Sequence, residues 1–183
     1  MSKRALINVD YTYDFVAEHG NLTCGKPGQD IEEKVVSLTK EFIEALEYVV
    51  FAIDGHEEGD HYHPESTLFP PHNIIGTAGR ALYGELAKVY DENKHKTNVS
   101  YLDKTRYSAF AGTDLEIKLR ERSIEEVHII GVCTDICVLH TAVDAYNKGF
   151  KIVIHKEAVA SFNEVGHKWA LEHFAQTLGA TVK

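Results

Sequence analysis

The chain has 183 residues, of which 44% are hydrophobic and 26% are charged, a composition typical of a globular domain with a full core. Its formal net charge of −9 argues against nucleic-acid and anionic-membrane partners, because both are bound through basic patches. The length predicts a single domain over residues 1–183. The chain has three cysteines, an odd count that disfavours a framework of disulfide bonds, so we expect a cytoplasmic protein.

Two apolar runs in the first third of the chain, residues 5–9 and 48–53, predict buried β-strands. Each run is followed by an aspartate, Asp10 and Asp54. Between them, apolar residues recur every three or four positions over residues 30–48, which is the period of an amphipathic helix. The first apolar run is too short for a signal peptide and ends at a charge, so we expect neither a signal peptide nor a membrane span.

Residues 55–79 form a long stretch without periodicity that holds three of the four prolines. A stretch of this length inside a compact domain is usually functional or disordered. Its aromatic residues and histidines favour a functional loop.

Strands and helices alternate through the rest of the chain. Helices are predicted over residues 81–90, 113–122, 134–148 and 163–178, and strands over residues 97–102, 126–131, 150–155 and 179–183. Trp169 and Phe174 lie on a helical stripe, and we expect both in the core. Apolar strands that alternate with helices indicate an α/β fold of three layers, α/β/α, around a mostly parallel sheet.

Four chemically active side chains follow predicted strands: Asp10, Asp54, Lys104 and Cys137. In a parallel sheet, ligands bind beyond the carboxyl ends of the strands, where the strand order reverses. We therefore expect these side chains to converge at one edge of the sheet.

Cys137 lies at the start of a predicted helix that follows a strand. If Thr134 or Asp135 caps this helix, Cys137 lies in its first turn, where free N–H groups lower the pKa of a thiol. A cysteine nucleophile needs a base and a cation, and Asp10 and Lys104 are suited to these roles. The alternative is that Cys137 is a small buried hydrophobic residue.

The chain has two other cysteines, Cys133 and Cys24. Cys133 lies four residues before Cys137, so the two thiols would share a metal, form a redox pair or be unrelated. Cys137 is preferred as the nucleophile because it falls inside the first turn. Cys24 lies in a glycine- and proline-containing loop and is treated as incidental.

A second group of polar residues suits a divalent metal. Asp54 and His56 are two positions apart at a strand end, so their side chains point the same way, and Glu65 and His72 follow in the loop. Imidazole and carboxylate ligands suit Zn²⁺, Fe²⁺ or Mn²⁺. A solvated acidic loop with surface histidines is the alternative. The rival ligands in this loop are His61 and His63.

Three aromatic residues near the same edge, Phe15, Phe69 and Tyr107, would wall a pocket for a flat ring, although ordinary loop packing explains each one alone. The glycine-rich motifs of dinucleotide and phosphate binding and the Gly-x-Ser-x-Gly elbow do not occur.

Taken together, these residues resemble the isochorismatase-like cysteine hydrolases and, within them, the nicotinamidases, also called pyrazinamidases. The matching motifs run over essentially the whole chain: Asn-Val-Asp-Tyr-Thr-Tyr-Asp-Phe at 8–15, Asp-Gly-His at 54–56 with Glu65 and His72, Asp-Lys at 103–104 before Tyr-Ser-Ala-Phe at 107–110, and Gly-Val-Cys-Thr-Asp-Ile-Cys-Val at 131–138.

The resemblance implies a six-stranded, mostly parallel sheet in the order 3-2-1-4-5-6. It implies a catalytic triad of Asp10, Lys104 and Cys137, with an oxyanion hole made by the backbone N–H groups of Cys133 and Cys137. In this family a cis peptide bond precedes the residue that matches Cys133, and it would direct these two N–H groups toward one point.

The resemblance also implies the cofactor and the substrate. One divalent metal, zinc ahead of iron or manganese, would be held by Asp54, His56, Glu65 and His72. The activity implied is hydrolysis of nicotinamide, and of pyrazinamide, through a thioester intermediate to release ammonia, which for nicotinamide yields nicotinate in NAD salvage. The substrate ring would lie between Phe15, Phe69 and Tyr107.

Three other functions stay open. Another amidase of the superfamily, acting on a ureido or carbamoyl compound, would keep the triad without the metal. Isochorismate cleavage does not call for this cysteine. A thiol or metal sensor would use Cys133, Cys137 and the histidine loop but leave Lys104 unexplained. The expected partner is a small-molecule substrate, and the oligomeric state, including a homo-oligomer, is left open.

Overall fold

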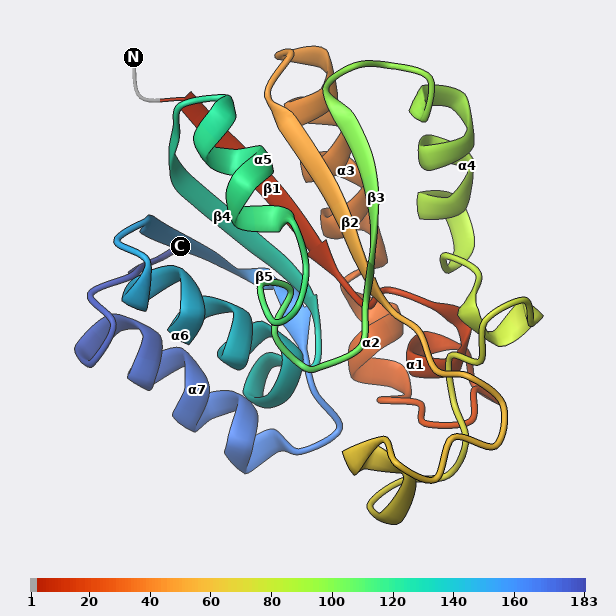
Figure 1. Ribbon diagram of the computed structural model, residues 1–183. Helices are drawn as coiled ribbons and strands as arrows, with labels where there is room; N and C mark the ends of the chain where they lie inside the picture. Colours follow the sequence, from red (N-terminus) through yellow and green to blue (C-terminus); the bar gives the residue numbers. More distant parts are fainter. Residues whose placement is uncertain (1–2) are drawn as a thin grey trace.

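The computed structural model describes residues 3–183, which form one sheet between two layers of helices (Figure 1). Six strands lie in the order β3-β2-β1-β4-β5-β6, and every pairing is parallel. The expected α/β fold and strand order are therefore confirmed. The strands are β1 (Lys3–Val9), β2 (Tyr48–Asp54), β3 (Val99–Lys104), β4 (Ile124–Val132), β5 (Lys151–Ala160) and β6 (Thr181–Val182).

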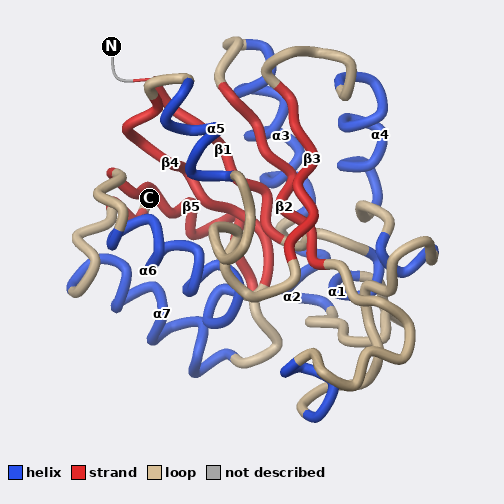
Figure 2. Tube along the Cα trace, in the orientation of Figure 1, coloured by secondary structure: helices blue, strands red, loops and turns tan. Residues whose placement is uncertain are grey.

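The helices cover both faces of the sheet (Figure 2). One face packs against α5, α6 and α7, and the other against α1 to α4. Strand β1 contributes to both cores, because Ile7 points to the first face and Leu6 to the second. The helices are α1 (Tyr13–Val16), α2 (Lys26–Asp30), α3 (Glu32–Glu44), α4 (Gly84–Asn93), α5 (Leu115–Glu121), α6 (Leu139–Asn147) and α7 (Glu164–Gln176).

Some local features differ from the sequence-based expectation. The short helices α1 and α2 were not predicted, because four or five residues are too few to show a helical period. The expectation that Trp169 lies in the core was wrong: it is 52% exposed and stacks on His173, whereas Phe174 is fully buried. Within residues 3–183, none of the helices is long and apolar enough to span a membrane.

A buried pair of histidines joins β4 to β5 away from the strand ends. His128 Nδ1 lies 2.8 Å from His155 Nε2, and His128 Nε2 lies 2.9 Å from Glu126 Oε1. The ring of Phe42 on α3 packs edge-on against His128. Burial lowers the pKa of both histidines, and the charge of the neighbouring imidazole helps to lower the pKa of His155 to about 4.

This pair is expected to make the fold less stable in mild acid. Both imidazoles stay neutral in the folded chain, but in the unfolded chain they take up protons near pH 6.5. The free energy of unfolding is therefore highest above pH 6.5 and falls as the pH drops toward 4. Nearby cations also lower the pKa of these histidines: Arg4 and Lys183 act on both, and Lys34 acts on His155. When the pH is lowered from 7 to 5, the free energy of unfolding should fall in the parent and in His155→Gln. We expect the fall in the variant to be smaller by about 1–2 kcal/mol, measured by urea denaturation. Equal losses in both proteins would assign the acid sensitivity to other groups.

Candidate active site

The carboxyl ends of the three strands β1, β2 and β3 bring an acid, a second acid and a lysine together. Asp54 and Lys104 are the last residues of β2 and β3 and are paired in the sheet register. Asp10 follows β1 in a left-handed conformation, with φ of 54°, and its Oδ1 accepts the Asp54 N–H at 2.7 Å. The parallel register therefore fixes these three residues as neighbours.

Lys104 is the centre of the arrangement, although its side chain is fully buried. Its Nζ lies 2.7 Å from Asp10 Oδ2, 3.5 Å from Asp54 Oδ1 and 3.9 Å from Cys137 Sγ. It also donates to the backbone oxygen of Arg106 at 3.0 Å. A buried charge needs such compensation, and the two carboxylates outweigh burial and raise the pKa of Lys104. Lys104 is therefore a permanent cation that joins the two acids to the thiol.

The surroundings of Asp10 and Cys137 decide which of these two groups carries a proton at neutral pH. Burial raises the pKa of Asp10 to about 6, an effect that Lys104 partly offsets, so the carboxyl is ionised at neutral pH. Burial also raises the pKa of Cys137 well above its ordinary value; Lys104 partly offsets this effect, and the charge of Asp10 adds to it. The expected lowering of this pKa was wrong, because burial outweighs the cation. At neutral pH the site therefore holds a protonated thiol and an ionised carboxylate.

Cys137 lies in a wide π-helical turn, Thr134–Val138, between β4 and α6. Neither Thr134 nor Asp135 caps this turn. In the described chain, the side chain of Thr134 contacts His167 within α7, and that of Asp135 contacts Ser161 just before α7. The peptide bond between Val132 and Cys133 is cis, as the family resemblance implies. Cys133 and Cys137 are both buried beside the same cavity.

A narrow pocket with a free volume of about 20 Å³ lies beside Cys137. All three aromatic residues expected near the substrate line this cavity. Ile136, Leu22 and Phe162 also line it and were missed, because single apolar residues in loops carry no distinctive pattern. The lining residues are Phe15, Leu22, Glu65, Phe69, Tyr107, Cys133, Ile136, Cys137 and Phe162.

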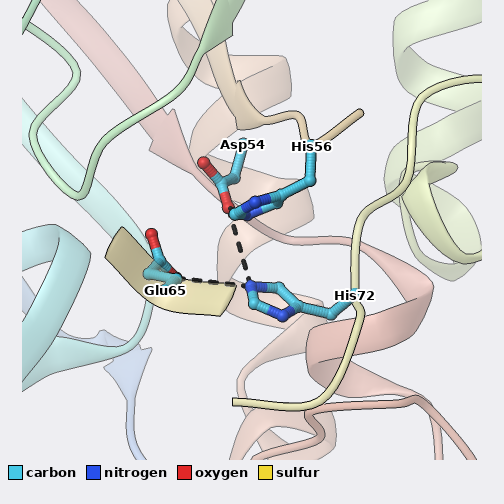
Figure 3. A group of neighbouring side chains, drawn as sticks. All are labelled: Asp54, His56, Glu65 and His72. Carbon is cyan, nitrogen blue, oxygen red and sulfur yellow. Dashed lines mark hydrogen bonds and ion pairs between the residues drawn. The ribbon is translucent and has the colours of Figure 1, made fainter. Parts of the chain in front are cut away.

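The four expected metal ligands also come together, next to this cavity (Figure 3). Asp54, His56, Glu65 and His72 are all buried, and one potential ligand atom from each lies within 4.8 Å of all the others. His56 Nε2 is 2.5 Å from Asp54 Oδ2. His72 Nε2 is 3.4 Å from Glu65 Oε2 and 3.8 Å from Asp54 Oδ2. Lys104 and Glu65 connect this metal group to the cavity and the thiol.

The donor atoms of this group fit a divalent cation. The N–H at Nδ1 of His72 donates to the backbone oxygen of Pro70 at 2.8 Å, which leaves the lone pair on Nε2. Within residues 3–183, His72 Nε2 and Asp54 Oδ1 are buried without a hydrogen-bond partner. Buried polar atoms rarely stay unsatisfied, and two imidazoles with two carboxylates are a common ligand set for zinc.

The two rival histidines lie outside the group of four. His63 Nδ1 accepts the backbone N–H of Glu65 at 3.2 Å, and its Nε2 donates to the backbone oxygen of Thr105 at 2.7 Å. Both ring nitrogens are used, so His63 has no lone pair for a metal, and its ring packs 4.3 Å from the ring of His56. His61 lines the neighbouring cavity beside the metal group. His63 therefore packs against His56 and holds the loop that carries Glu65.

Comparison with known proteins agrees with this geometry. The chain is 68% identical over 180 residues to the isochorismatase family protein PncA of Bacillus subtilis, and the match covers 98% of each chain. It superposes on the crystal structure of nicotinamidase/pyrazinamidase PncA from Bacillus subtilis with a TM-score of 0.97 and 98% coverage of both chains, and the two sequences are 65% identical. It also superposes on the pyrazinamidase of Pyrococcus horikoshii in complex with zinc, at 28% identity, a TM-score of 0.86 and 99% and 98% coverage.

The same relationship is found by comparison with protein families. The model of the isochorismatase domain matches residues 4–183, which is almost the whole chain. The parallel sheet, the strand-end triad and this match lead to one conclusion: the chain belongs to the isochorismatase domain family.

Proposed function

We propose that this chain is a metal-dependent cysteine amidohydrolase that converts nicotinamide to nicotinate and ammonia and also accepts pyrazinamide. The observation that carries the proposal is one buried lysine, Lys104, between a thiol with its base and a complete set of metal ligands. A thiol beside a base suits amide cleavage, and the aromatic side chains that line the adjoining pocket are suited to contact a small flat ring. The similarity to nicotinamidase/pyrazinamidase structures supports the same activity.

Cys137 and Asp10 carry the bond-breaking steps in this proposal. Asp10 takes the thiol proton while Cys137 Sγ attacks the carboxamide carbon. Asp10 then gives the proton to the leaving nitrogen, so that ammonia departs and a thioester remains. Water attacks the thioester with Asp10 again as the base, and the acid product and the free thiol are formed. Each step keeps one proton moving between Asp10 and the reacting atoms, which fits its pKa of about 6.

Two further features stabilise the charges that develop. Lys104 faces both Asp10 and Cys137, so it favours the thiolate character that appears as the sulfur attacks. The backbone N–H groups of Cys133 and Cys137 belong to residues that line one cavity, and we assign them to the tetrahedral oxyanion. A donor of this kind contributes roughly 3–4 kcal/mol in comparable sites.

The rest of the site binds and orients the ring. Phe15, Phe69 and Tyr107 line the cavity as its aromatic walls. Asp54, His56, Glu65 and His72 would hold one divalent metal, which we assign as zinc from the ligand set and from the zinc-containing pyrazinamidase structure. When bound, this ion would supply a Lewis acid for the ring nitrogen of the substrate.

Ammonia release from nicotinamide by the purified protein, with and without prior chelation, tests both halves of the proposal. We expect release that falls on chelation and returns with added zinc. Asp54→Ala and His72→Ala should lower zinc affinity roughly 100-fold or more, because each removes a direct ligand, whereas His61→Ala should retain zinc. Elemental analysis and equilibrium dialysis measure the metal.

The opposite results are equally informative. Release that is indifferent to chelation, in a sample free of metal by elemental analysis, would remove the metal from the function. No release from nicotinamide by a folded, reduced and zinc-loaded sample, together with release from a carbamoyl compound, would assign the triad to another amidase of the family.

A further inference from the structure

The turn that carries Cys137 is fastened from outside by the start of α7. Ser161 Oγ donates to Asp135 Oδ1 at 2.6 Å, and Asn163 Nδ2 donates to Asp135 Oδ2 at 3.3 Å. Both carboxylate oxygens of Asp135 are therefore held, one by each neighbour. Asp135 is only two residues before the nucleophile.

A second attachment lies one turn further along α7. Thr134 Oγ1 lies 2.8 Å from His167 Nδ1, and Thr134 is fully buried. The start of the helix is itself fixed, because the Asn163 side chain accepts the Gly166 N–H at 3.0 Å and the Asn163 N–H donates to Ser161 Oγ at 3.2 Å. Two consecutive residues of the turn are thus tied to one rigid segment.

Gly166 shows how closely this segment approaches the turn. A Cβ at residue 166 would lie 2.0 Å from Asp135 Oδ2 and 2.7 Å from Asn163 Nδ2, distances that real Cβ atoms do not reach. A methyl group here would therefore have to displace the Asp135 carboxylate or the helix. Only glycine fits at this point of contact.

The attachments act on geometry and not on substrate. The cavity over Cys137, as the described residues define it, is lined by neither Asp135 nor Ser161 nor His167. The turn is a π-helical one, a rare conformation that is frequent at functional sites. Its sulfur must meet Asp10 and Lys104 at once, and a misplacement of about 1 Å far from the chemistry can cost on the order of 100-fold in rate.

We propose that Ser161, Asn163 and His167 form a clamp of positioning residues that holds Asp135 and Thr134, and thereby orients the sulfur of Cys137 and the adjacent backbone N–H groups. The proposal rests on the amidase function for its kinetic meaning. It assigns a role to the start of α7 that neither the triad nor the metal group requires.

Two variants test the clamp, with one matched control. Gly166→Ala inserts a methyl group against Asp135, and Asp135→Asn places an amide where Asn163 donates. Val165→Ala, on the neighbouring and 78% exposed position of α7, removes atoms without touching the turn. We expect kcat for nicotinamide to fall about 10- to 100-fold in the first two variants, with KM and bound zinc unchanged, and to stay near the parent value in the control.

A second readout needs no amide substrate. The rate at which iodoacetamide alkylates Cys137, followed by peptide mass spectrometry, should change in Gly166→Ala and Asp135→Asn but not in Val165→Ala. Alanine is a better helix former than glycine, so a loss of kcat in Gly166→Ala with an unchanged melting temperature cannot come from a weaker helix.

Two outcomes would overturn the clamp. In the first, kcat and the alkylation rate of both variants stay within about twofold of the parent. In the second, kcat, bound zinc and melting temperature fall together, which is the signature of a general structural role. If the parent itself hydrolyses no amide, the proposed function fails, while the alkylation rates still decide for or against the clamp.

Discussion

Replacement of Cys137 by alanine is expected to lower the rate of nicotinamide hydrolysis by about 10⁴-fold or more, because the attacking atom is removed while base and cation remain. The fold should persist, since the residue is small and alanine retains its Cβ in the core. Ammonia release measures the activity, and thermal unfolding followed by circular dichroism measures the fold.

The other two thiols supply matched controls for this experiment. Cys133 lines the same cavity, and Cys24 is buried on the other side of the sheet from most of the contacts of Cys137. Cys133→Ala and Cys24→Ala should both keep most of the activity, because the proposed chemistry uses only the backbone of Cys133. Near-normal turnover in Cys137→Ala with loss in Cys133→Ala would transfer the nucleophile to Cys133.

Replacement of Lys104 by methionine should affect activity and stability together. It leaves the buried carboxylates of Asp10 and Asp54 without their cation, and breaking a buried pair in this way costs about 3–5 kcal/mol. In a chain of this length that cost lowers the melting temperature by roughly 6–20 °C. Loss of the cation also raises the pKa of Asp10 further, so the base is protonated at neutral pH and activity falls by about 10²- to 10⁴-fold.

A double variant separates these two effects. Lys104→Met combined with Asp10→Asn removes the charge that the lysine compensates, so part of the lost stability should return while activity does not. Both proteins are compared in metal-free buffer by thermal unfolding. If Lys104→Met alone unfolds at the parent temperature, the lysine does not compensate the carboxylates as its 2.7 Å contact with Asp10 indicates.

The sheet could be predicted from sequence because its strands are apolar on both faces and alternate with helices. Strand order followed from the family resemblance, and the side chains of β1 divide between two cores as a fully covered sheet requires. Short helices and exact ends could not be predicted. The start of α6 was displaced by the π-helical turn Thr134–Val138, a conformation with no signature in the pattern of apolar residues.

The candidate site could be located from sequence by one rule, that strand ends meet at one edge of a parallel sheet. This rule brought together Asp10, Asp54 and Lys104, whose contacts the structure contains. The pKa of Cys137 could not be predicted, since it depends on how deeply the thiol is buried. The contacts of Asp135 could not be predicted either, because its partners in the segment before α7 are more than 20 residues away in the chain.

The metal group draws His56, Glu65 and His72 from a single connection, residues 55–79, whereas Asp10, Lys104 and Cys137 lie on other segments. Strand ends are fixed by the hydrogen bonds of the sheet, but a surface connection tolerates replacement and insertion. In evolutionary terms, three of the four candidate metal ligands are inherited on one stretch of sequence, apart from Asp10, Lys104 and Cys137. Exchange of this one connection would remove the metal group and leave the strand-end residues in place.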